Sequence, residues 1–151
     1  MNKGTKIALG VSGLLLVGCL VGFFVTLNDA MGQIDKAREG SVAEANELLI
    51  LAAGQWNYDD VVMRTSSAFL PEAEAQAKFN EWSATYGTLV SGEMALKDFK
   101  VADEQLKDVS LVARFESVVE FEKGNAVVAM TLTRQPKNAW ELASLELSPA
   151  P

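Results

Sequence analysis

The 151-residue chain contains no histidine and a single cysteine, Cys19. The lack of histidine excludes serine–histidine and cysteine–histidine nucleophilic catalysis, histidine-ligated metals and histidine-based proton transfer. A single cysteine excludes an internal disulfide and a thiolate metal cluster. The sequence also lacks an Asp-rich loop of the EF-hand type. We therefore expect no catalytic centre, no metal site and no cofactor.

Basic residues are scarce: the chain has 13 of them against 20 acidic residues. Lys3 and Lys6 precede a long apolar run, which leaves 11 basic residues against 20 acidic ones after it, a formal charge of −9. An acidic surface repels nucleic acid and anionic lipid head groups. We therefore expect no nucleic-acid partner.

Charge is absent altogether from residues 7–27. A helix of this length spans about 31 Å, which matches the hydrocarbon core of a bilayer. Basic residues flank its start and acidic residues follow its end, and basic flanks stay in the cytoplasm. The sequence thus predicts a cytoplasmic tail at 1–6 and a transmembrane signal anchor at 7–27. The expected location is the bacterial inner membrane, with the C-terminal part in the periplasm.

Two alternatives to an uncleaved anchor exist. Leu16-Val17-Gly18-Cys19 fits a lipoprotein box, in which Cys19 would be lipidated and become the mature N-terminus. Lipoproteins usually turn polar after that cysteine, whereas Leu20–Val25 here are apolar or glycine, which favours the anchor. A cleaved secretory signal is disfavoured because the apolar stretch runs past any cleavage site.

Gly18 and Gly22 form a Gly-x-x-x-Gly pair inside the apolar run. Small residues four apart let two helix backbones approach closely in lipid. This pair predicts a partner helix, either from a second copy of the chain or from another integral membrane subunit.

After the uncharged run at 7–27, apolar residues at helical spacing dominate the first half of the remaining chain. Residues 28–40 form a connector whose helical spacing extends to Arg38, and we expect Gly40 to end it. Ser41 and Glu44 fit a capping box that begins a new helix.

Four helix-boundary signals follow in order. Gly54 is expected to end the helix that begins at Ser41. Asn57 is placed to cap a second helix, and Pro71 begins a third at its natural first position. Gly87 is expected to end this third helix.

After Gly92 the apolar period changes to 2, which is typical of half-buried strands. We expect a bulge at 97–98, a hairpin turn at 123–125 and a register change in the last strand. The expected strands cover residues 94–101, 109–121, 126–132 and 140–147. Helices followed by hairpin-connected strands predict an α+β domain. Its three helices pack on a curved antiparallel sheet of about four strands, which forms a cone.

The chain from 41 to 149 resembles the nuclear transport factor 2-like (cystatin-like) superfamily, and small bacterial envelope domains of unknown function within it are most similar. The resemblance rests on the turn Gly54-Gln55-Trp56-Asn57-Tyr58, on Phe79, Trp82 and Tyr86-Gly87, and on the closing segment 140–149. It implies a cone-shaped domain. The superfamily includes isomerases, ligand binders and non-catalytic assembly domains, so the fold does not define an activity.

Enzymes of this superfamily place an acidic base inside the cone. Asp59 and Asp60 fall in a first helical turn, where acidic residues favour the helix dipole. Asp98 lies beside the expected bulge; it could point into the cone as a base, and a solvated edge charge is the favoured interpretation. Glu116, Glu120 and Glu122 alternate with apolar residues, which places them on the outer sheet face. They form either a solvated surface or an acidic docking site for a basic partner.

Aromatic residues at core spacing either fill the interior or line a ligand pocket, and we favour the interior. Arg64 and Arg114 are candidates for pairing with carboxylates. The residues that line the pocket or the core are Trp56, Trp82, Tyr86, Phe115, Met130 and Trp140.

Together these patterns predict a membrane-anchored, non-catalytic accessory or assembly subunit of a larger membrane complex. Its partners are membrane lipid and integral membrane subunits, and a homo-oligomer is a further option. The alternative is an envelope lipoprotein or an anchored module that binds a small ligand in the cone, with an isomerase-type enzyme disfavoured.

Overall fold

A computed structural model describes residues 31–104, 108–135 and 138–151. The predicted anchor at 7–27, with Gly18, Cys19 and Gly22, lies outside these residues. None of the helices in the described part of the chain is long and apolar enough to cross a membrane.

The chain divides into two compact units, Met1–Ala37 and Arg38–Pro151. Of the first unit, residues 31–37 are helical, with Met31 and Ile34 exposed. The second unit holds the sheet and the remaining helices.

The helix that includes residues 38–55 corrects two expectations. It passes through Gly40 and Ser41 without a break and ends at Gln55. Ser41 is fully buried, and its hydroxyl donates to the carbonyl of Arg38 at 2.7 Å, so it does not cap a helix start. An interior glycine costs a helix only about 1 kcal/mol, which packing of the neighbouring turns offsets.

The two later helices begin within one residue of the predicted positions, and Pro71 is the cap of the later one rather than its first residue. The helix α2 (Tyr58–Val61) has Asn57 as its cap: the side chain of Asn57 accepts from the backbone N–H of Asp59. A 3-10 turn, η1 (Val62–Arg64), follows directly. The helix α3 (Glu72–Tyr86) begins after Pro71. Asp59 and Asp60 are exposed in the first turn of α2, as expected for charges at a helix N-terminus.

The α3 helix ends at Gly87, as predicted. This residue has φ 76° and ψ −160°, a conformation that is essentially restricted to glycine. Lys123 closes the same end, because its Nζ atom donates to the carbonyl of Ala84 at 2.7 Å. Carbonyls at a helix C-terminus lack partners within the helix, so this ammonium satisfies one of them.

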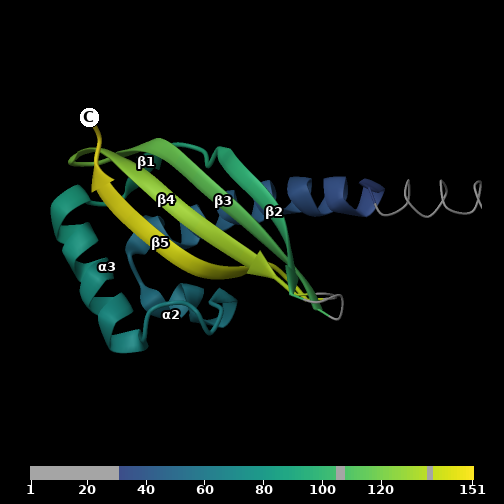
Figure 1. The fold of residues 1–151 in the computed structure, drawn as a ribbon. Helices are drawn as coiled ribbons and strands as arrows, with labels where there is room; N and C mark the ends of the chain where they lie inside the picture. The colour runs from purple at the N-terminus through teal and green to yellow at the C-terminus, as the bar shows by residue number, and fades with distance from the viewer. Residues whose placement is uncertain (1–30, 105–107, 136–137) are drawn as a thin grey trace, which may run out of the picture. The chain divides into compact units, whose positions relative to one another are not determined.

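The described strands form one five-stranded antiparallel sheet (Figure 1). The strand order is β1-β3-β4-β5, and β2 also pairs with β3. The sequence did not predict β1, a short edge strand. The strands are β1 (Leu89–Ser91), β2 (Leu96–Glu104), β3 (Asp108–Phe121), β4 (Gly124–Arg134) and β5 (Glu141–Pro149).

Two predicted irregularities are confirmed. The register of β2 on β3 shifts between Leu96 and Asp98, and that of β5 on β4 shifts next to Leu142. The β3–β4 hairpin lies one residue earlier than predicted. Phe121 pairs with Gly124, so the turn consists of Glu122 and Lys123. Gly124, with φ 137°, opens the return strand.

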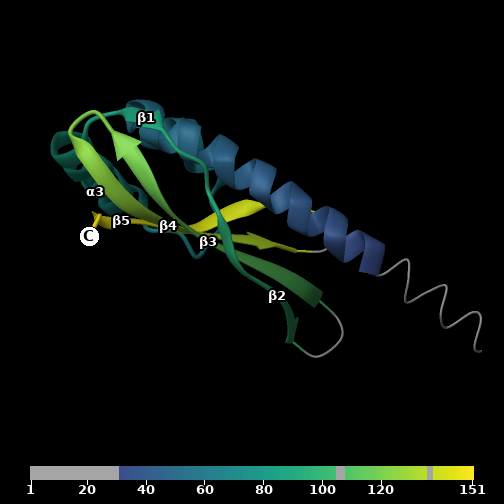
Figure 2. The same ribbon diagram turned by 90° about the horizontal axis from the view of Figure 1, so that it is seen from above.

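Alternation along the strands separates two faces of the sheet. We call the buried one the inner face; Ala113, Phe115 and Val119 of β3 and Val128 and Met130 of β4 lie on it. The outer face carries exposed Arg114, Glu116, Val118 and Glu120. The strands curl strongly (Figure 2). An α+β domain with three described α-helices and a curled antiparallel sheet is thereby confirmed.

Candidate functional site

Trp56 connects the end of the first described helix to the end of α3. It has φ 53°, and its N–H donates to the carbonyl of Ala52 at 3.1 Å, which closes the last helical turn. Its indole Nε1 donates to the carbonyl of Gly87 at 2.6 Å. A bulky residue with positive φ is strained, so the surrounding structure must hold it in place.

Three aromatic rings surround Trp56, and further rings contact these three. Its centroid lies 5.9 Å from that of Phe79, 5.8 Å from that of Trp82 and 5.8 Å from that of Phe121. Tyr86 lies 5.8 Å from Phe121. Rings at these separations attract one another beyond the burial of their area. These side chains come from the helix connection, from α3 and from β3, and they fill the space between them.

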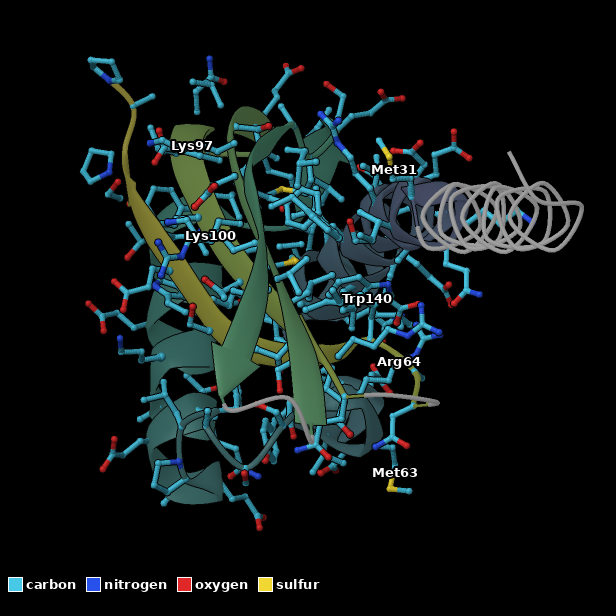
Figure 3. The ribbon with its side chains drawn as sticks, turned by 45° about the vertical axis from the view of Figure 1, so that its right-hand side comes forward. Met31, Met63, Arg64, Lys97, Lys100 and Trp140 are labelled. Atoms are coloured by element: carbon cyan, nitrogen blue, oxygen red, sulfur yellow. The ribbon has the colours of Figure 1, made fainter. Side chains whose placement is uncertain are left out.

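The other predicted lining residues lie elsewhere in the core. Phe115 and Met130 face each other across β3 and β4, and both are buried. Trp140, which Figure 3 labels, is buried just before β5. Its ring meets that of Phe99 of β2 edge-to-face, with 6.2 Å between the centroids. Its Nε1 atom has no hydrogen-bond partner among the described residues. The six residues therefore do not converge on one cavity.

Asp98 does not lie on the inner face. Its carboxylate is 2.9 Å from Lys100 Nζ and 3.9 Å from Arg114 Nη1, on the outer face. The hydrogen bond from Lys100 is the main cause that lowers the pKa of Asp98 below its usual value. A carboxylate in this state is ionised and solvated, as expected for an edge charge, and is poorly suited to act as a buried base.

The three glutamates of the predicted acidic surface each have a local partner. Glu116 pairs with Lys97 at 2.7 Å, and Glu120 accepts from the hydroxyl of Ser91 at 2.8 Å. Glu122 accepts from the backbone N–H of Thr88 at 3.0 Å, which is the main cause that lowers its pKa. These contacts favour a solvated, internally paired surface over an acidic docking site.

An open hollow of about 320 Å³ lies on the outer face across four strands. Thr131, Ser144 and Ala129 line it together with charged side chains of both signs, and Phe115 and Met130 of the predicted pocket residues also border it. Lys97 and Lys100 of β2 lie on this side of the sheet (Figure 3). Because ion pairs run along its rim, the hollow is a mixed-charge surface that is open to water. Its charged lining residues are Lys97, Asp98, Arg114, Glu116 and Glu146.

Arg64 forms a charged cluster that the sequence only partly indicated. Its Nη1 atom is 2.9 Å from Glu47, and its Nε atom is 3.6 Å from Glu44. Burial is the main cause that raises the pKa of Glu44; Arg64 opposes this effect, and Glu47 adds to it. The proposed capping role of Glu44 is wrong, because the helix does not begin at Ser41. The i,i+3 spacing of the two glutamates could have indicated a shared cationic partner.

No three residues with metal-ligating side chains come together in residues 31–104, 108–135 and 138–151. Comparisons of the chain with protein-family models, with curated proteins and with solved structures find no match.

Proposed function

We propose that this protein is a membrane-anchored, non-catalytic accessory or assembly subunit of a larger membrane complex. The uncharged run at 7–27 anchors it in the bacterial inner membrane, and the acidic domain lies on the periplasmic side. Its partners are membrane lipid and one or more integral membrane subunits, which contact it through Gly18 and Gly22.

The proposal that the protein is non-catalytic rests on the packing of the inner sheet face. Phe115, Met130, Trp82 and Trp140 are all buried in the core. An open cone with an ionisable group would be expected of a ligand-binding module or an isomerase. The candidate base Asp98 instead lies in an ion pair on the outer face. These facts favour a role carried by the surface and the anchor.

We further propose that the domain belongs to the nuclear transport factor 2-like superfamily. Three helices precede a curled antiparallel meander, which is the element order that the resemblance implies. The residues of the quoted turn and of the α3 end support it, since Trp56 and Tyr58 both pack against Phe79. Fold membership adds nothing to the argument for activity.

The helix contact is tested by the double substitution of Gly18 and Gly22 to leucine. Tagged full-length chain is purified from native membranes in mild detergent, and the proteins that accompany it are identified and quantified by mass spectrometry. Leucine side chains prevent close backbone approach, so we expect the accompanying integral membrane proteins to be lost. The matched control replaces Val17 and Val21 with leucine one position earlier and is expected to keep them. An unchanged set of partners in the glycine variant would refute helix-mediated docking.

Anchor and lipoprotein are distinguished by the intact mass of the chain extracted from membranes. The anchor predicts a mass that includes the segment before Cys19, whereas lipidation removes that segment and adds acyl chains. A Cys19→Ala variant provides the control: for an anchor its mass changes only by the substitution, whereas for a lipoprotein it regains the segment before residue 19 and lacks the acyl chains.

A further inference from the structure

Few side chains in the folded domain react readily with oxidants. The sequence from Arg38 to Pro151 contains no cysteine and no histidine. The side chains there that two-electron oxidants attack most readily are therefore thioethers and indoles. They are Met63, Met94, Met130, Trp56, Trp82 and Trp140.

Burial separates one of these side chains from the rest. Met94 and Met130 are 3% and 1% exposed, and the three tryptophans are all buried. Met63 is 91% exposed. An oxidant in solution thus reaches the sulfur of Met63 directly, whereas it reaches the other sulfurs only when the core opens.

The turn that carries Met63 is fixed on both sides. Val61 before it is fully buried, and Arg64 after it is held by Glu47. The hydroxyl of Thr65 donates to the carbonyl of Val62 at 2.8 Å and closes the η1 turn. Met63 is consequently held outward from the domain (Figure 3).

We propose that Met63 is an oxidation site, at which a hydroperoxide converts the thioether to a sulfoxide. The O–O bond of the oxidant breaks and an S–O bond forms at Sδ. The sulfur loses two electrons, and the hydroperoxide is reduced to water or an alcohol. Because Met63 makes no core contact, the domain keeps its fold while its most exposed large apolar side chain becomes polar.

The test exposes the full-length chain in detergent micelles to limiting hydrogen peroxide and follows each methionine by peptide mass mapping. The peptide that contains Met63 is expected to gain one oxygen about tenfold faster than those that contain Met94 and Met130. The same chain unfolded in urea is the reference, and there the three residues are expected to react at similar rates. Equal rates in the folded chain, or reaction of Met94 before Met63, would overturn the proposal.

A Met63→Leu variant provides the matched control. In this variant the peptide that contains residue 63 is expected to gain no oxygen, and Met94 and Met130 are expected to react no faster than in wild type. Tryptophan fluorescence then tests the second half of the proposal: wild-type protein oxidised at Met63 is expected to unfold at the same temperature as untreated protein. A lower unfolding temperature of the singly oxidised protein would show that Met63 has a structural role and would refute an isolated surface site.

Discussion

Replacing Gly40 by alanine should stabilise the protein, although the sequence suggests that this glycine ends a helix. Gly40 lies in the interior of a continuous helix. A Cβ atom built there meets nothing closer than Trp140 Nε1, at 3.9 Å, which is an ordinary contact. Alanine in a helix interior is more stable than glycine by about 0.5–1 kcal/mol. For a domain of this size that corresponds to a rise in unfolding temperature of about 2–4 °C.

The assay is thermal unfolding of the full-length chain in detergent, followed by tryptophan fluorescence. All three tryptophans are buried, so their emission reports on loss of the core. The matched variant is Gly87→Ala, which should act in the opposite direction. Its φ of 76° strains any side chain, and a Cβ atom would lie 2.8 Å from Glu122 Oε2. We expect a loss of about 2–3 kcal/mol there.

Each variant has an outcome that would contradict the described helix ends. A Gly40→Ala protein that unfolds at a lower temperature than wild type would mean that the helix breaks at residue 40, as the sequence first suggests. A Gly87→Ala protein of unchanged stability would mean that α3 does not end in the conformation described.

Two further outcomes follow from the contacts of the α3 end. The pKa of Glu122 is lowered in the folded state, so its contribution to stability is present above the ordinary value of 4.5 and is lost as the pH falls below that value. Acid unfolding should therefore be less steep in Glu122→Gln, measured by fluorescence as the pH falls below 4.5. Trp56→Phe removes the indole bond to the Gly87 carbonyl, and we expect a loss of about 1–2 kcal/mol. An unchanged unfolding temperature would argue against that bond.

Local signals in the sequence located most elements of the domain. Asn57 and Pro71 define helix starts through hydrogen bonding and backbone geometry that depend only on adjacent residues. The alternation from 109 to 121 defines a strand with one buried face, because side chains alternate strictly between the faces of a sheet. The two register shifts were also visible, as slips in the alternation of residues 94–101 and 140–147.

Contacts between distant residues decided what the sequence left open. The end of a helix at Gly40 is a local preference of about 1 kcal/mol, and burial of Ser41, Ala45 and Leu48 overrides it. The short strand β1 pairs with β3 through residues about thirty positions away, and its composition gives little local signal.

The sequence by itself excluded chemistry that needs a histidine or a pair of cysteines in this chain, since folding cannot provide a residue type that is missing. It also determined the uncharged run and the acidic character, because both are sums over composition. Only the tertiary structure decided that Glu44 pairs with Arg64, that Asp98 lies on the outer face, and that Met63 is exposed while Met94 is buried. The physical reason is that these properties depend on which distant segments pack together. Residue type alone does not reveal this packing, since Met63 and Met94 are the same type of residue and differ in burial.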